Sequence, residues 1–213
     1  ISKALALWVD AFFSRHQRVP EIILCAPTGK AAARMNDSWQ AQKPLLQSQL
    51  RPELQGALPE TAQTLHRVLG INPLSRQAKA DAESPLKADL LILDEASMID
   101  LPLLAQVLQA LPGECHLLLV GDPNQLPSIE AGNLLGSLMP DAEGRYALPA
   151  LKCAHLHLQE NYRQLAQEGL SRLARDCLLL PAEQFVDQLT ANTYPHVSWS
   201  PHPLGQRQQI ITE

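Results

Sequence analysis

Two adjacent carboxylates, Asp94 and Glu95, stand directly after an apolar run at 90–93 that has the length of a buried strand. Side chains alternate along an extended chain, so the two carboxylates would point to opposite sides of the strand tip. A nucleotide hydrolase needs such a pair, because one carboxylate holds Mg²⁺ and the other orients or deprotonates the attacking water. The alternative is an N-cap, since Asp or Glu at a strand-to-helix turn often only bonds free helix amides.

A second polar loop, GDPNQLP at 121–127, follows the next apolar run in the same way. The neutral side chain of Gln125 could hydrogen-bond a γ-phosphate or its attacking water. The alternative is an ordinary Gly/Pro-rich turn, to which these residue types belong anyway.

The segment Pro27-Thr28-Gly29-Lys30 contains the Gly-Lys pair of a phosphate loop but lacks the rest of that motif. A phosphate loop, G-x-x-x-x-G-K-[ST], needs Gly at position 24 and Ser or Thr at position 31. Here those positions are Leu24 and Ala31, so this segment is not an ATP cradle. The amides of Thr28, Gly29 and Lys30 could instead hold one phosphate of a nucleic-acid backbone, and the alternative is a plain helix start.

The elements that must position these residues alternate between strands and helices. Short apolar runs bounded by turn signals predict strands at 21–26, 89–93, 115–120 and 154–158. Apolar residues at three- and four-residue spacing predict helices at 2–15, 29–40, 63–70, 101–111, 165–180 and 182–190. This alternation predicts an α/β fold with a parallel sheet flanked by helices, in which the polar strand ends converge on one crevice.

Composition excludes several classes of protein. The 213 residues are 46% apolar and 18% charged, enough to bury a core, and no apolar run reaches the length of a membrane span. No signal peptide is seen at the N-terminus, so a cytoplasmic protein is expected. Neither the four cysteines nor the seven histidines have metal-site spacing, and the residue pair His155 and His157 fits one strand face.

The net charge of −5 hides an uneven distribution along the chain. Residues 1–88 carry 11 Lys and Arg against 7 Asp and Glu, a net charge of +4, and residues 89–213 carry a net charge of −9. The first part could face a polyanion, although an excess this small is usually a solvated surface.

Two stretches between the predicted elements are polar or rich in proline. The stretch 39–60 contains Pro44, Pro52 and Pro59, which should interrupt any helix, so we expect an excursion on the surface there. The stretch 70–88 is expected to be a polar loop, and the residues from 193 onward an irregular connector.

Five segments in order along the chain closely resemble motifs of superfamily 1 DNA helicases, specifically the RecD branch, the alpha subunit of exodeoxyribonuclease V. They are APTGKAAARM (26–35), TLHRVLG (64–70), LDEASMID (93–100), VGDPNQLPSIEAG (120–132) and LQENYRQ (158–164). The resemblance covers about residues 1–180. The resemblance implies a RecA-like fold, ATP with Mg²⁺ as cofactor, and movement 5′ to 3′ on single-stranded DNA. It also implies recombinational repair together with RecB- and RecC-like subunits.

The resemblance also implies a role for each matching residue. Asp94 would coordinate Mg²⁺, Glu95 would activate the water, and Gln125 would sense the γ-phosphate. Arg163 would neutralise the transferring phosphoryl group, a task suited to a permanently charged guanidinium. Two residues, Gly121 and Asp122, would contact the nucleotide. Single-stranded DNA would be contacted by Thr28, Gly29, Lys30, Thr64 and His66.

The chain departs from the family in one respect, because the phosphate loop that precedes the helix at 2–15 in this family is absent. We therefore expect an incomplete first RecA-like motor domain at 1–160, and at 161–213 the segment with Arg163 and a helical extension toward a second domain. This chain alone should have negligible ATPase activity. The alternatives are a stand-alone RecD-like or relaxase-associated helicase, an RNA helicase, and a non-catalytic interaction module.

Overall fold

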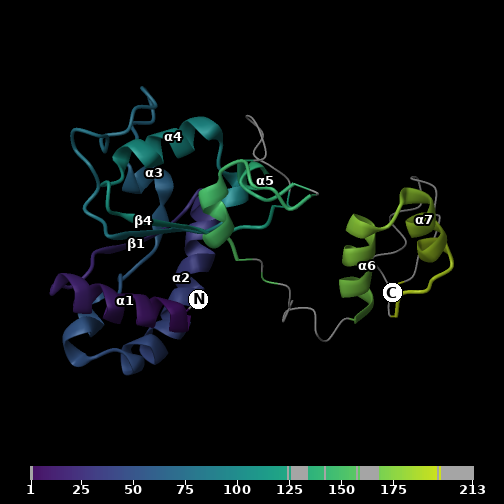
Figure 1. The fold of residues 1–213 in the computed structure, drawn as a ribbon, viewed down its shortest axis with the longest axis horizontal. Coiled ribbons are helices and arrows are strands. Elements are labelled where there is room, and N and C mark those ends of the chain that lie inside the picture. Colours follow the sequence, from purple (N-terminus) through teal and green to yellow (C-terminus); the bar gives the residue numbers. More distant parts are fainter. Residues whose placement is uncertain are drawn as a thin grey trace. The chain divides into compact units, whose positions relative to one another are not determined.

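The computed structural model describes residues 2–123, 125, 134–141, 143–156, 158, 168–195 and 197. The chain divides into two compact units, Ile1–Ala154 and His155–Glu213 (Figure 1). The first unit contains the sheet and all the described residues of the candidate site.

The first unit is built on a four-stranded, fully parallel sheet in the order β2-β1-β3-β4. Strands β1 (Ile22–Ala26) and β3 (Leu90–Leu93) lie at its centre and are almost entirely buried, as continuous apolar runs require. Strand β4 (His116–Leu119) pairs with β3, and the two-residue strand β2 (Gln63–Thr64) pairs with the end of β1. The predicted parallel α/β architecture is confirmed.

Helices cover both faces of this sheet (Figure 1). Helix α1 (Ser2–His16) and the second half of α2 (Gly29–Gln49) pack on the face that carries Ile22 and Leu24. Helices α3 (Leu65–Val68) and α4 (Leu101–Ala110) cover the opposite face. The two faces are distinct because side chains alternate along each strand, so that Cys25, one residue after Leu24, belongs to the second cluster.

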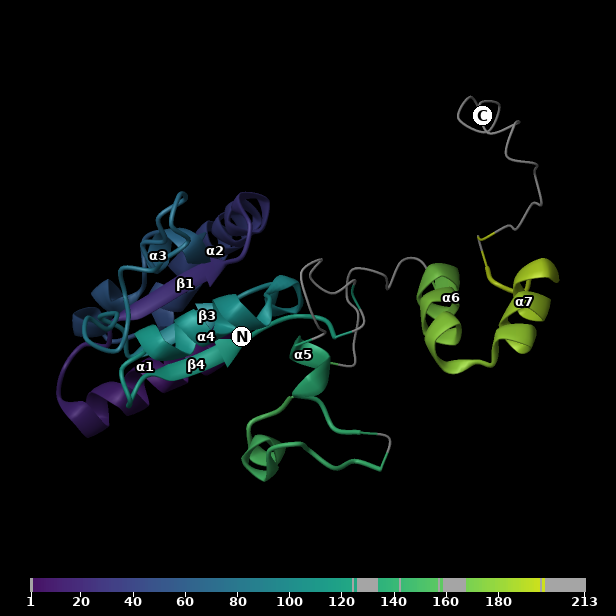
Figure 2. The same cartoon turned by 90° about the horizontal axis from the view of Figure 1, so that it is seen from above.

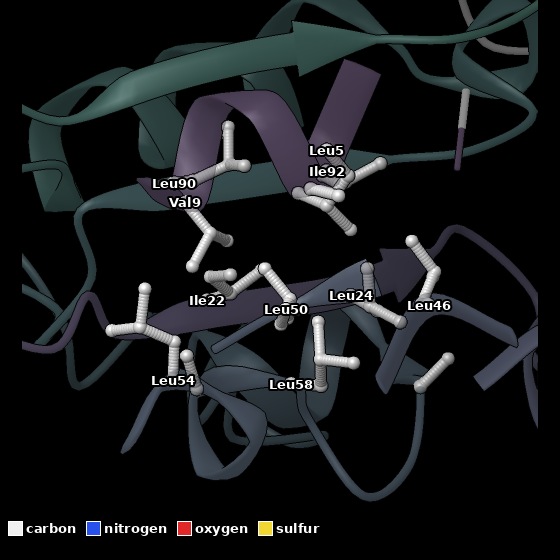
Figure 3. Close-up of a cluster of buried hydrophobic side chains, with 13 residues drawn as sticks. Leu5, Val9, Ile22, Leu24, Leu46, Leu50, Leu54, Leu58, Leu90 and Ile92 are labelled. Atoms are coloured by element: carbon white, nitrogen blue, oxygen red, sulfur yellow. The ribbon is translucent and has the colours of Figure 1, made fainter. Parts of the chain in front are cut away.

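The expectation of a surface excursion at 39–60 is wrong. Helix α2 continues through Pro44 to Gln49, and the 3₁₀ helix η1 (Pro52–Ala57) follows. Four leucines from this stretch lie in the core beneath the sheet (Figure 3), namely Leu46, Leu50, Leu54 and Leu58. Burial of these side chains offsets the hydrogen bond that Pro44 cannot donate within the helix.

Smaller differences concern short elements. The helix predicted at 63–70 is strand β2 followed by the single turn α3. None of the described residues at 154–158 is in a strand, and His157 lies outside the described residues. Three short helices, η2 (Ala96–Met98), α5 (Leu134–Ser137) and η3 (Pro149–Cys153), occur between the predicted elements.

The polar loop predicted at 70–88 is confirmed as irregular, although its backbone is tied to two helices. The carbonyl of Leu69 accepts hydrogen bonds from the amides of Lys79 (3.0 Å) and Ala80 (3.1 Å). The amide of Leu86 donates to the carbonyl of Ala110 at the end of α4 (2.8 Å).

The second unit contains the helical hairpin α6 (Glu168–Leu179) and α7 (Ala182–Thr190), which lie side by side (Figure 2). Both helices were predicted, and α7 has the predicted bounds. Tyr194 is buried beside α6, with the guanidinium of Arg172 over its ring at 5.6 Å. No helix in the described part of the chain is long and apolar enough to cross a membrane.

Candidate nucleotide and DNA sites

All the described candidate residues lie at or shortly after the carboxyl ends of the four strands. Because the sheet is parallel, these ends lie along one edge, where open α/β sheets bind ligands. The strand order divides the candidates into two groups. Those expected to contact DNA follow β2 and β1, and those expected to contact nucleotide follow β3 and β4.

At the end of β1, Thr28 is the N-cap of α2. Its Oγ1 accepts a hydrogen bond from the amide of Ala31 (3.2 Å), and its carbonyl accepts from the amide of Ala32 (2.9 Å). The second interpretation of this segment, an ordinary helix start, therefore describes its structure. Gly29 and Lys30, the first two residues of the helix, are exposed. A threonine hydroxyl that accepts one hydrogen bond still has a proton to donate, so capping does not prevent Thr28 from contacting a phosphate.

The end of β2 repeats this arrangement beside the end of β1. Thr64 pairs in register with Ala26 and caps α3, where its Oγ1 accepts from the amide of Arg67 (3.4 Å). His66, in the first turn of α3, is exposed. The sheet thus brings together two strand ends, each with a threonine cap and an exposed cationic or titratable side chain two residues later.

At the end of β3, the two carboxylates have different environments. Asp94 is held by the backbone, since its amide donates to the carbonyl of Cys25 (2.9 Å) and its Oδ1 accepts from the amide of Glu95 (2.9 Å). Glu95 has a left-handed backbone with φ 53° and ψ 40°, which is uncommon for a residue other than Gly, Asn or Asp. Within the described residues Glu95 makes no side-chain capping bond, and the cap of α4 is Asp100, so the N-cap interpretation does not explain Glu95.

The end of β4 touches the loop that follows β3. The carbonyl of Val120 accepts a hydrogen bond from the amide of Ala96 (2.9 Å). A Cβ atom added to Gly121 would lie 2.9 Å from Cδ2 of Leu135 and 3.1 Å from the backbone nitrogens of Ala96 and Ser97, so any larger residue would push these neighbours away and glycine favours the close approach of the two loops. The exposed Asp122 accepts from the amide of Gln125 through its carbonyl (3.2 Å), which closes a turn.

Ser97 is a residue of this site that the sequence does not single out. It is 1% exposed, and its Oγ is buried without a hydrogen-bond partner among the described residues. Serine is common in loops, so only the burial of its hydroxyl distinguishes it. Arg163 lies outside the described residues, as do 126–133 of the loop that contains Gln125.

The described residues contain no group of three or more His, Cys, Asp or Glu side chains able to hold a metal by themselves. A Mg²⁺ ion that arrives with a nucleotide needs only one or two protein carboxylates, because phosphates and waters complete its coordination. Asp94 and Glu95 fit that requirement.

A cavity of about 460 Å³ lies at the opposite, amino-terminal edge of the strands, where Arg18 and Asp89 line it. Arg18 donates to Asp89 Oδ2 (2.6 Å), and this bond holds the pKa of the Asp89 carboxyl below its usual value. The Arg18 guanidinium is occupied by this pairing, and the cavity contains none of the candidate site residues.

Comparison with known proteins agrees with the α/β fold described above. The profile of the AAA domain family matches residues 4–131. The RecBCD enzyme subunit RecD of Haemophilus influenzae is 38% identical over 159 residues, which are 74% of this chain and 24% of that protein. The ATP-dependent RecD2 DNA helicase of Deinococcus radiodurans is 35% identical over 158 residues, 74% of this chain and 18% of that protein.

Among solved structures, Bacteroides Pif1 bound to ssDNA is similar over 87% of this chain and 43% of that chain, with a TM-score of 0.44 and 20% identity. The chain spans about a quarter of the length of the RecD protein that it matches.

Proposed function

We propose, from the premise that this chain belongs to the AAA domain family and is RecD-like in sequence, that it forms part of the motor of an ATP-dependent DNA helicase. The observation that carries the proposal is the order of the strand ends. Candidate DNA residues follow β2 and β1, candidate nucleotide residues follow β3 and β4, and paired strands connect the two groups.

On the nucleotide side, each residue is assigned the role that its chemistry supports. Asp94, fixed by two backbone hydrogen bonds, would hold Mg²⁺, and Glu95 would orient the attacking water and accept its proton. Gln125 would respond to the γ-phosphate, and Arg163 would neutralise charge on the phosphoryl group. Bound ATP with Mg²⁺ supplies the phosphoanhydride that is hydrolysed. The left-handed backbone of Glu95 supports this assignment, because strained backbone is concentrated at functional sites.

On the DNA side, the hydroxyls of Thr28 and Thr64 and the amide of Gly29 would contact backbone phosphates. Lys30 would add a positive charge, and His66 would stack on a base or donate to a phosphate. Binding of this kind follows the backbone and reads no sequence, which suits a motor that moves along DNA.

For the complete protein, we propose a cytoplasmic helicase that moves 5′ to 3′ on single-stranded DNA in recombinational repair, together with RecB- and RecC-like subunits. This proposal is supported by the 38% sequence identity with the RecD subunit of the RecBCD enzyme of Haemophilus influenzae. A stand-alone RecD-like helicase is the second candidate, because the Deinococcus relative at 35% identity is named as a DNA helicase and not as the subunit of an enzyme. The 213-residue chain by itself should turn over ATP negligibly, since its sequence has no phosphate loop.

The test is ATP hydrolysis stimulated by single-stranded DNA, measured on the full-length gene product and on the 213-residue chain. We expect turnover only in the full-length protein. Glu95→Gln should reduce kcat by at least about 10²-fold, because it removes the base while keeping the size of the side chain. Glu114→Gln, at an exposed carboxylate on the opposite edge of the sheet, is the matched control and should retain full activity. A fully active Glu95→Gln variant would refute the assignment.

A further inference from the structure

The segment Leu58–Ala62, which leads into β2, is held by side chains of α2. It has no regular secondary structure, yet Leu58 and Ala62 are buried. Three residues on one face of α2, Asn36, Trp39 and Gln40, bond to its backbone.

Of these three side chains, Asn36 both donates a hydrogen bond to the segment and accepts one from it. Its Nδ2 donates to the carbonyl of Ala62 (3.1 Å), and its Oδ1 accepts from the amide of Ala62 (2.6 Å). The indole of Trp39 donates to the carbonyl of Pro59 (2.7 Å), and the amide of Gln40 donates to the carbonyl of Glu60 (2.7 Å). The asparagine therefore satisfies both backbone groups of Ala62, much as a neighbouring strand would.

The position of Ala62 matters because β2 begins at the next residue and contains only Gln63 and Thr64. Two register pairs join this strand to β1, Cys25 with Gln63 and Ala26 with Thr64. So short a pairing fixes the strand weakly along its length, and a slip of one residue would turn its side chains to the other face. The bonds from Asn36 add a fixed point directly before the strand.

Helix α2 is in turn fixed to the end of β1 by its cap at Thr28. The same helix thus begins at one candidate DNA contact and, two turns later, holds the chain that leads to the other. We propose that Asn36 is a positioning residue for DNA binding, which keeps Thr64 in register with Ala26 and so holds Thr64 and His66 beside the strand end that leads to Thr28. This inference rests on the proposed function, because it assigns Asn36 to the DNA side of that motor.

The test uses the full-length protein and measures ATP hydrolysis against the concentration of an oligo(dT) strand. Asn36→Ala removes both bonds, and we expect the half-saturating DNA concentration to rise about three- to tenfold. We expect kcat at saturating DNA and the DNA-independent rate to stay within about twofold, because the nucleotide side is untouched. Gln49→Ala, at an exposed amide on the same helix, is the control and should leave all three values unchanged.

A role confined to folding would give the opposite pattern. It would reduce the active fraction, lowering kcat and the DNA-independent rate together while the half-saturating concentration stayed constant, and that result would overturn the proposal. Two other variants keep the test decisive if Asn36→Ala is insoluble. Asn36→Asp retains the bond accepted from the Ala62 amide but sets a carboxylate oxygen against the Ala62 carbonyl, and Gln40→Ala removes one exposed contact to the same segment. Asn36→Asp should raise the half-saturating concentration and Gln40→Ala should raise it by a smaller factor, and an unchanged value in Asn36→Asp would overturn the proposal.

A double-mutant cycle separates action through Thr64 from a general effect. If Asn36 acts by placing Thr64, then Asn36→Ala should weaken DNA binding less in a Thr64→Ala background than in the parent. Full additivity would refute the coupling. Failure of the parent to respond to DNA would instead refute the proposed function, so the two failures are distinguishable.

Discussion

Replacement of Leu54 by alanine tests whether residues 39–60 form part of the core, although the prolines of this stretch predict a surface segment. Leu54 is 0% exposed and packs in the cluster beneath the sheet with Leu50 and Leu58 (Figure 3). If the segment were a surface excursion, the substitution would cost less than about 0.5 kcal/mol. The structure predicts a much larger loss.

The magnitude follows from the atoms removed and the cavity that they leave. Leu→Ala deletes the equivalent of about three methylene groups at about 0.8 kcal/mol each, and a buried site that cannot collapse adds a cavity cost. We expect Leu54→Ala to lower the free energy of unfolding by about 3 kcal/mol. With a urea m-value of about 2 kcal/mol/M, the unfolding midpoint would fall by about 1.5 M.

Tryptophan fluorescence during urea unfolding is a suitable assay. Trp8 and Trp39 are partly buried against the same cluster, so their emission reports on this core. Leu45→Ala is the matched control, because Leu45 lies on α2 but is 61% exposed, and it should shift the midpoint only slightly. Equal shifts for the two variants would show that Leu54 is not in the core.

Two further predictions concern the two edges of the sheet. Gly121→Ala places a Cβ 3.1 Å from the backbone of Ala96, so the two nucleotide-side loops must separate, and we expect the kcat of the full-length protein for ATP to fall about tenfold or more. Gly113→Ala, whose added Cβ meets nothing within 4 Å, should retain activity, and equal losses in both would refute this reasoning. Asp89→Asn replaces the carboxylate partner of Arg18 by a neutral amide and should lower the melting temperature at pH 7 by a few degrees. Folding lowers the pKa of Asp89, so the ionised carboxylate stabilises the folded protein. This contribution is fully present above the pKa of the unfolded state, about 4, and is lost as the pH falls through the pKa of the folded state. The difference between parent and Asp89→Asn in thermal melts should therefore disappear in acid, and a difference that grew in acid would contradict this sign.

Strands β1, β3 and β4 and the polar residues that follow them could be predicted from the sequence, whereas the two-residue strand β2 lies where a helix was expected. The apolar run at 90–93 is too short for a helix and too apolar for a loop, so a buried strand followed by Asp94 and Glu95 is its natural interpretation. The hairpin helices could be predicted equally well, because their amphipathic spacing is local.

The course of residues 39–60 could not be predicted in the same way. Pro44 signals a helix end, and only the burial of Leu46 and the leucines after it explains why α2 continues. The bonds from Asn36 to Ala62 join residues 26 apart, and an asparagine in an ordinary helical pattern gives no sign of such a partner.

The sequence by itself determined which residue types follow each strand, because hydrophobic periodicity and turn chemistry act over a few neighbouring residues. Tertiary structure decided which strand ends are neighbours. The order β2-β1-β3-β4 places Thr64 beside Ala26 and the Glu95 loop against Gly121, residues that are 38 and 26 positions apart. Strand pairing and close backbone approach depend on the packing of the whole sheet, and no local pattern in the chain encodes them.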